Sequence, residues 1–125
     1  MYDEACAKAY ELAAEHGYTF IHPFDDLTVA TGQGTIAMEV IQELPPVDYI
    51  LVPIGGGGLA TGVSTLAKLL KPNLKVIGVE PSGAACMKAS FEKGEVTTVS
   101  PVSTLADGTA IKTPGYNIFT SVRQH

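Results

Sequence analysis

The stretch Tyr49-Ile50-Leu51-Val52-Pro53-Ile54-Gly55-Gly56-Gly57-Gly58-Leu59-Ala60 decides the fold of this chain. Its first half is a continuous apolar run, which is typical of a strand covered on both faces of a parallel sheet. After the glycines, apolar residues recur at helical spacing, at positions 59, 62, 63, 66 and 70. The four glycines therefore predict a tight loop that joins a strand to a helix.

A glycine loop of this kind is suited to binding an anion. Glycine adopts backbone conformations with positive φ and has no Cβ, so consecutive glycines can turn several N–H groups toward one ligand. The helix that follows adds unpaired N–H groups and the positive end of its dipole. The next lysine along the chain is Lys68, too far into the helix to reach the loop. We expect an uncharged cup of amides that binds the phosphate of a small molecule.

The size and charge of the chain limit its class. Its 125 residues, 46% of them hydrophobic, suit a single domain over residues 1–125 with a buried core. A formal net charge of −5 without a basic run argues against nucleic acid as a partner. The uncharged stretch 49–67 contains five glycines and Pro53, so it favours strand, loop and helix over a membrane span. The start lacks the pattern of a signal peptide, and Cys6 and Cys86 are expected to be reduced, so we expect a cytoplasmic protein.

Helical and strand patterns alternate along the rest of the chain. Apolar periodicity predicts a helix over 2–16 that ends at Gly17, a second helix entered at 31–35 and stopped by Pro45-Pro46, further helices over 59–70 and 84–93, and a last one that begins at Pro114. Short β-prone runs predict strands over 19–23 and 76–79 and an extended segment over 96–99. We therefore expect an α/β fold, with a parallel sheet, helices on both faces, and a ligand at the carboxyl ends of the strands.

Other glycine motifs fit the run less well. In the pattern G-x-x-x-x-G-K-[ST], matched from Gly57, Val63 stands where the lysine must neutralise phosphates, which argues strongly against a P-loop enzyme. A dinucleotide (NAD)-binding module remains an alternative, because Gly55-x-Gly57-x-x-Ala60 follows a strand and Glu80 ends the next one. A turn without a ligand would need only one or two glycines for close packing, so four glycines favour a ligand.

Residues for metal or acid–base chemistry are sparse. Glu80 and the nearby carbonyl of Ala84 could help to coordinate a hard cation, although a lone acidic residue after a strand is more often solvated or a helix cap. The three histidines have no metal-binding spacing. Asp25-Asp26 favours a turn or a cap over a pair of catalytic carboxylates.

Five short segments of the chain together carry a family resemblance. They are Pro23-Phe24-Asp25-Asp26, Gly32-Gln33-Gly34-Thr35, Val52-Pro53-Ile54-Gly55-Gly56-Gly57-Gly58-Leu59, Val76-Ile77-Gly78-Val79-Glu80-Pro81 and Thr104-Leu105-Ala106-Asp107-Gly108. Their order and spacing resemble the threonine and serine dehydratases, including members similar to serine racemases. These are fold-type II enzymes dependent on pyridoxal 5′-phosphate (PLP), and the resemblance implies part of their large, cofactor-binding domain.

The resemblance also implies a cofactor site. In that family the glycines and the next residue bind the cofactor phosphate with main-chain N–H groups, which transfers to Gly55, Gly56, Gly57, Gly58 and Leu59. The segment that matches 105–108 lies near the active site in relatives, which adds Asp107 and Gly108 as further candidates.

Other functional parts of the family are only partly matched. Some members bind a divalent cation through the positions of Glu80, the Ala84 carbonyl and an acidic residue, but that last position is Cys86 here. The family's Schiff-base lysine lies in a Ser-Phe-Lys-x-Arg-like segment far upstream of the glycines, and no lysine of this chain matches it. We therefore name no catalytic residue and interpret the chain as a middle fragment.

The expected function follows from the resemblance. The parent enzyme is expected to deaminate the small amino acid L-threonine, or L-serine, giving 2-oxobutanoate and ammonia from threonine, with no nucleic acid or membrane partner. The isolated chain is expected to be inactive and to form homo-oligomers through exposed sheet edges and apolar faces. A non-catalytic module that binds phosphate or only self-associates is a further alternative.

Overall fold

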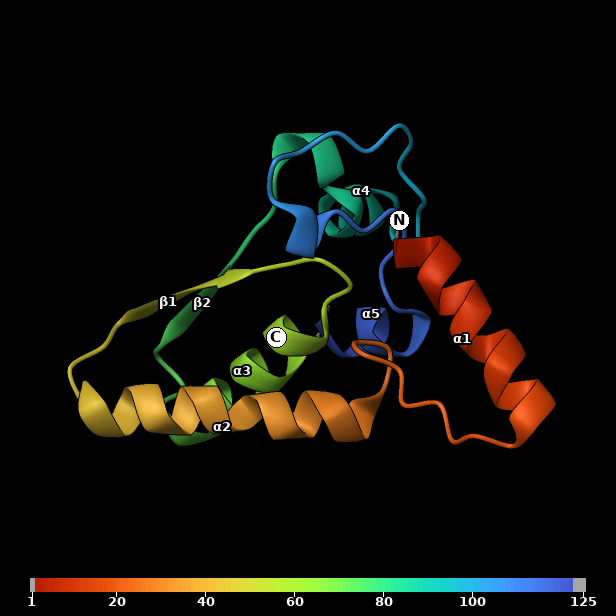
Figure 1. Cartoon of the computed structure of the whole chain (residues 1–125). Helices are drawn as coiled ribbons and strands as arrows, with labels where there is room; N and C mark the ends of the chain where they lie inside the picture. The colour runs from red at the N-terminus through yellow and green to blue at the C-terminus, as the bar shows by residue number, and fades with distance from the viewer. Residues whose placement is uncertain (1, 123–125) are drawn as a thin grey trace.

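Two parallel strands and the helix between them form the centre of the structure, a computed structural model that describes residues 2–122 (Figure 1). Strand β1 (Tyr49–Pro53) pairs with β2 (Lys75–Val79), with Tyr49 opposite Lys75 and Pro53 opposite Val79. Helix α3 (Gly58–Leu70) makes the crossover between the strands. The strand, loop and helix expected around the glycines are confirmed, and so is the parallel α/β fold.

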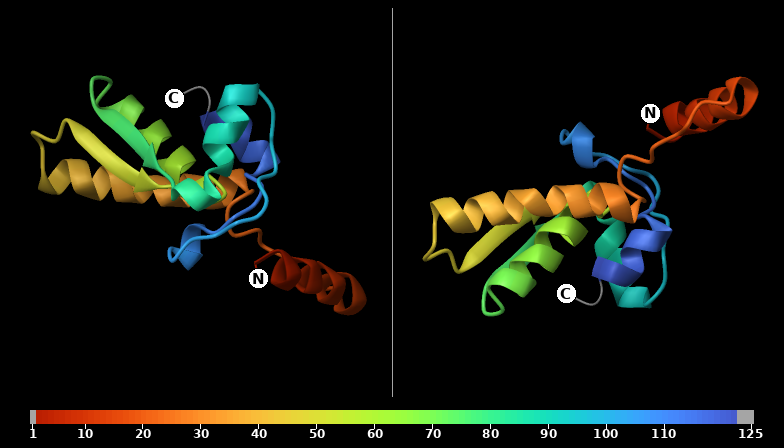
Figure 2. Two further views of the ribbon diagram at one scale, coloured as in Figure 1. Left: turned by 90° about the horizontal axis from the view of Figure 1, so that it is seen from above. Right: turned by 90° about the horizontal axis from the view of Figure 1, so that it is seen from below.

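The remaining elements surround this unit. They are the helices α1 (Tyr2–His16), α2 (Leu27–Glu43), α4 (Cys86–Lys93) and α5 (Tyr116–Val122), with short 3-10 turns at Ser82–Ala84 and Asp107–Thr109. Gly17 follows α1 with a φ of 71°, and Gly94 caps α4 with a φ of 78°, the left-handed conformation that commonly ends a helix. Helix α1 projects away from the rest of the chain (Figure 2). No helix in residues 2–122 is long and apolar enough to cross a membrane.

Helices α2 and α3 lie side by side at very short range, as Figures 1 and 2 show. A Cβ added to Gly62 in α3 would lie only 2.0 Å from the carbonyl oxygen of Ala30 in α2. Because real Cβ atoms do not approach so closely, glycine is required at this crossing. Ala37 of α2 and Ala67 of α3 are fully buried in the same core. This packing fixes α3 and therefore the loop at its N-terminus.

The two faces of the sheet have different surroundings. Val52 is buried in the core with residues of α3 such as Val63. On the opposite face the side chains of Leu51 and Ile77 are 65% and 44% exposed. Helices α2 and α3 both lie on the face of the sheet that carries Val52 (Figure 1). The sequence predicts helices on both faces of the sheet, but within the described residues helices cover only one face.

One predicted strand, over 19–23, is not found in the described residues. The sheet of the described residues consists of β1 and β2, and the segment 96–99, predicted only as extended, is not part of it. The first segment instead packs its aromatic side chains, with the Phe20 ring centroid 4.4 Å from that of Tyr10 in α1. β propensity reflects packing against neighbouring strands, and no described strand lies beside 19–23, so the strand predicted there is wrong.

Two helix boundaries also differ from the prediction. Helix α2 begins at Leu27 rather than within 31–35, because the Asp26 carboxylate accepts hydrogen bonds from the amides of Thr28 and Val29 at 2.7 and 3.0 Å. The predicted capping role in Asp25-Asp26 is thus confirmed at Asp26. Helix α5 begins at Tyr116 rather than Pro114, and Gly115 lies at the position before it, with its carbonyl accepting the amide of Phe119 at 2.9 Å.

Candidate functional site

The glycine loop lies at the carboxyl end of β1 and leads directly into α3. Gly57 has a φ of 103°, which favours glycine, and α3 begins at the next residue. The loop forms one wall of a cavity of about 440 Å³. The rest of that cavity is lined by Tyr2, Pro23, Phe24, Gln33, Pro53, Leu59, Gly108, Thr109 and Ile111.

The backbone amides of the loop have no acceptor within the described residues. The last amide of the strand, that of Ile54, donates to the carbonyl of Val79 at 2.9 Å, but none from Gly55 to Leu59 donates to a protein atom. Gly56, Gly57 and Gly58 are buried, and buried amides without a partner are rare in folded proteins. A row of such donors beside a cavity fits an anion with several oxygens, such as a phosphate group.

All four glycine positions leave little room for a side chain. An added Cβ would lie 2.1 Å from the Phe24 ring at Gly56, 2.6 Å from Met87 at Gly57, and 2.8 Å from the Phe24 carbonyl oxygen at Gly58. At Gly55 it would lie 3.1 Å from a side-chain carbon of Ile111. The expectation that packing alone needs one or two glycines is therefore wrong. The number of glycines does not separate packing from binding; the unpartnered amides carry the case for a ligand.

The segment that packs on the loop is held by two polar side chains. His22 Nδ1 accepts the amides of Phe24 and Asp25 at 3.3 and 2.8 Å, which fixes the Phe24 ring over Gly56. Asp25 Oδ1 in turn accepts the amides of Asn117 and Ile118 at 2.9 and 3.2 Å, at the start of α5. The His22 bonds are local, to amides two and three residues along the chain, but the sequence patterns do not predict them. A turn or a cap is predicted for Asp25, but its partners at the start of α5 are not, because they become its neighbours only in the fold.

Of the other candidate residues predicted from the sequence, one lines the cavity and one does not. Gly108 lines the cavity, whereas Asp107 is not among the lining residues and its Oδ1 accepts the amide of Gly108 at 2.9 Å. Tyr2 also lines the cavity, and burial, together with its hydrogen bond to Cys6, raises the pKa of the phenol above its ordinary value. A neutral phenol therefore faces the loop. The residues that line the cavity include no lysine.

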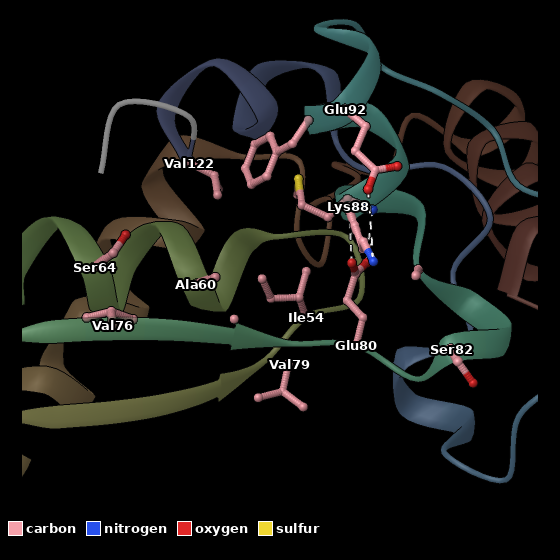
Figure 3. A pocket seen from close by; sticks show the side chains of 14 residues that line it. Ile54, Ala60, Ser64, Val76, Val79, Glu80, Ser82, Lys88, Glu92 and Val122 are labelled. Carbon is pink, nitrogen blue, oxygen red and sulfur yellow. Dashed lines mark hydrogen bonds and ion pairs between the residues drawn. The ribbon is translucent and has the colours of Figure 1, made fainter.

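Glu80 is engaged in capping a helix. Its two carboxylate oxygens accept the amides of Met87 and Lys88 in the first turn of α4, each at 2.9 Å (Figure 3). Burial, and secondly the charge of Glu80, raise the pKa of the Cys86 thiol to about 11, so the thiol stays protonated at neutral pH. Residues 2–122 contain no cluster of three metal-ligating side chains.

The donor set around Glu80 and Ala84 therefore does not fit a hard cation, which prefers several oxygen ligands. The same amide bonds occupy the Glu80 carboxylate, which a dinucleotide site would need for a ribose hydroxyl, so the NAD alternative loses support.

A cavity of about 720 Å³ lies beside Glu80. Its lining is largely apolar and also includes Lys88 and Glu92 of α4 (Figure 3).

Comparison with known sequences gives extensive matches. The L-threonine dehydratase (biosynthetic) of Haemophilus influenzae is 48% identical over 124 residues, which cover 99% of this chain and 24% of the relative. The L-threonine ammonia-lyase of Geobacter sulfurreducens is 49% identical over 122 residues, which cover 98% of this chain and 30% of the relative. The chain thus spans less than a third of the length of these two relatives.

Solved structures and a family model lead to the same family. The processed form of threonine deaminase isoform 2 from Solanum lycopersicum matches with a TM-score of 0.93 and 43% identity, over 99% of this chain and 34% of that one. Maize serine racemase matches with a TM-score of 0.84 and 34% identity, over 91% of this chain and 36% of that one. The model described as "Pyridoxal-phosphate dependent enzyme" covers residues 1–125. Because that match runs from the first residue to the last, the chain belongs to the pyridoxal-phosphate dependent enzymes.

Proposed function

We propose that this chain is the part of a PLP-dependent threonine ammonia-lyase that binds the phosphate of the cofactor. The observation that carries the proposal is the row of unpartnered amides from Gly55 to Leu59 beside a cavity of about 440 Å³. These amides donate to the phosphate oxygens, and the N-terminus of α3 adds its partial positive charge. The residues form a single unit within the cofactor-binding domain.

In the proposed enzyme the cofactor supplies the chemistry, and this chain positions the cofactor. When bound, PLP supplies an electron sink for reactions at the α-carbon of an amino acid. The chain's own residues hold the phosphate end, exclude water from it with the Phe24 ring, and present neutral groups around it. The reaction proposed for the whole enzyme is the deamination of L-threonine to 2-oxobutanoate and ammonia, which the threonine-specific names of the relatives support.

The isolated chain is proposed to be catalytically inactive. No lysine lines the described cavity, so the chain does not itself supply an amine to attach the cofactor.

We also propose a cytoplasmic location, which the free thiols of Cys6 and Cys86 support, and a homo-oligomeric state, which the exposed sheet face at Leu51 and Ile77 supports. Light scattering that finds only monomer would oppose the last point.

A binding experiment on the amides tests the site. The 15N-labelled chain is titrated with PLP, with inorganic phosphate, and with pyridoxal, which lacks the phosphate, while amide resonances are recorded. PLP and phosphate are expected to shift the resonances from Gly55 to Leu59, and pyridoxal is expected to leave them in place. Unchanged loop resonances with both phosphate ligands would refute the proposed site.

Two variants sharpen the test. Gly56→Ala places a methyl carbon 2.1 Å from the Phe24 ring and should abolish the shifts. Gly32→Ala is the matched control, because nothing lies within 4 Å of its added Cβ and it is not part of the cavity lining. In a separate assay, formation of 2-oxobutanoate from threonine and PLP by the purified chain would contradict the proposed inactivity.

A further inference from the structure

The loop carbonyls have fixed partners, in contrast to the loop amides. The Gly56 carbonyl accepts the amide of Gly115, and the Gly57 carbonyl accepts the amide of Thr61, each at 2.9 Å. In a planar trans peptide, the carbonyl of one residue and the N–H of the next point in opposite directions. A bond that holds a loop carbonyl therefore also determines where the following amide points.

The Gly55 carbonyl is held by a side chain. Its partner is the thiol of Cys86, which donates with a sulfur-to-oxygen distance of 3.8 Å. Cys86 is fully buried, and the raised pKa of its thiol keeps the proton needed for this bond. The peptide that this thiol holds is the one that carries the Gly56 N–H.

The backbone around Cys86 is itself held from two directions. Its carbonyl accepts a hydrogen bond from Ser90 Oγ at 2.7 Å, and Ser90 Oγ accepts the amide of Thr97 at 2.9 Å. The two amides after Cys86 are bound by the Glu80 carboxylate. The thiol therefore sits on a rigid helix start rather than on a mobile segment.

We propose that Cys86 is a positioning residue of the phosphate site, whose thiol holds the Gly55 carbonyl and so aims the Gly56 amide at the anion. The proposal rests on the proposed function, because it assigns a role toward the phosphate that the loop binds. It also gives the start of α4 a link to the site that needs no metal ion. An S–H donor is weak, so the expected effect on affinity is modest, about two- to fivefold.

The test compares amides within the loop. Inorganic phosphate is titrated into the 15N-labelled chain and into the variants Cys86→Ala and Cys86→Val, which remove the donor and bracket its volume. We expect weaker binding by that factor and a selective loss of the phosphate-induced shift at Gly56, with the shifts at Gly58 and Leu59 retained. Lys93→Ala is the control: it changes an exposed side chain in the last turn of the same helix, away from Cys86 and the loop, and should leave the Gly56 response unchanged.

A second measurement uses the intact thiol, so it does not depend on the folding of those variants. In the variant Cys6→Ala, which keeps Cys86, the S–H stretching band should lie below that of a free thiol and shift when phosphate binds. A band at the free-thiol frequency, or an unchanged Gly56 response in Cys86→Ala, would overturn the proposal. If the original chain shows no shift at any loop amide, the proposed function fails instead, and the two failures are thereby distinguished.

Discussion

The substitution Gly57→Ala tests why the loop needs glycine at the start of α3. Gly57 has a φ of 103°, and an added Cβ would lie 2.6 Å from Met87 Cε and 2.8 Å from Ile118 Cγ2. The Met87 methyl is the end of a flexible side chain and can shift. The Ile118 methyl belongs to a β-branched, fully buried side chain and has little freedom to do so.

The expected loss has two parts. The left-handed backbone costs an alanine about 1–2 kcal/mol, and overpacking the core costs a further 1–3 kcal/mol or so. We therefore expect Gly57→Ala to lower the free energy of unfolding by about 2–5 kcal/mol. Gly17→Ala is the matched control, because its φ is 71° but nothing lies within 4 Å of the added Cβ. It should lose only the backbone part.

Urea unfolding followed by circular dichroism gives both free energies. The difference between the two variants isolates the crowding around Gly57 and should be about 1–3 kcal/mol. Where Gly57→Ala still folds, its loop amides should respond more weakly to phosphate, while those of Gly17→Ala should respond normally. Equal losses in the two variants would refute the reasoning, because they would mean that Met87 and Ile118 leave room for a methyl group.

Three further outcomes are expected. The pKa of Cys86 is raised from its ordinary value of 9.0 to about 11, so between these pH values the folded state keeps a proton that the unfolded state loses. The contribution of this thiol to the free energy of unfolding is therefore complete below pH 9 and falls by about 1.4 kcal/mol per pH unit toward pH 11. Urea unfolding at each pH measures this, and Cys86→Ala should remove that component. Asp25→Ala removes the acceptor for two amides of α5 and should cost about 1–2 kcal/mol in thermal unfolding, with Asp25→Asn milder; an Ala variant as stable as the original would exclude the capping role. Gly62→Ala would place a Cβ 2.0 Å from the Ala30 carbonyl oxygen and should cost at least about 3 kcal/mol in urea, whereas Gly32→Ala, with open space around it, should not destabilise.

The parts of the fold that local sequence predicts well have a strong period or a capping residue. Helix 2–16 with Gly17 after it, and the helix after the glycines, are confirmed because their patterns determine local structure. The strand before the glycines is confirmed because β2 pairs with it. The segment 19–23 has the composition of a strand but no strand beside it, and a strand requires a partner. Asp26 moved the start of α2 because a side-chain cap outweighs the glycines that follow.

The site divides in the same way. Local sequence predicts the amide donors, since the first N–H groups of a helix have no acceptor within it and glycines leave them accessible. It does not predict the supports from Asp25 and Cys86, because these residues act on partners that the fold brings near. The support from His22 is local, to an amide three residues along the chain, and was missed all the same. The assignment of the loop to a cofactor phosphate remains a prediction for the titration to test.

The supports behind the glycine loop have a consequence for how the chain folds. The Gly55 carbonyl is held by a residue of α4, and the Gly56 carbonyl by Gly115, close to the far end of the described chain. Contacts between segments so distant along the chain require the closure of long loops, which is slow and entropically costly. We therefore expect the working shape of the glycine segment to be completed late in folding. A ligand that needs this shape binds only chains that have finished folding, and by mass action it draws the population toward them.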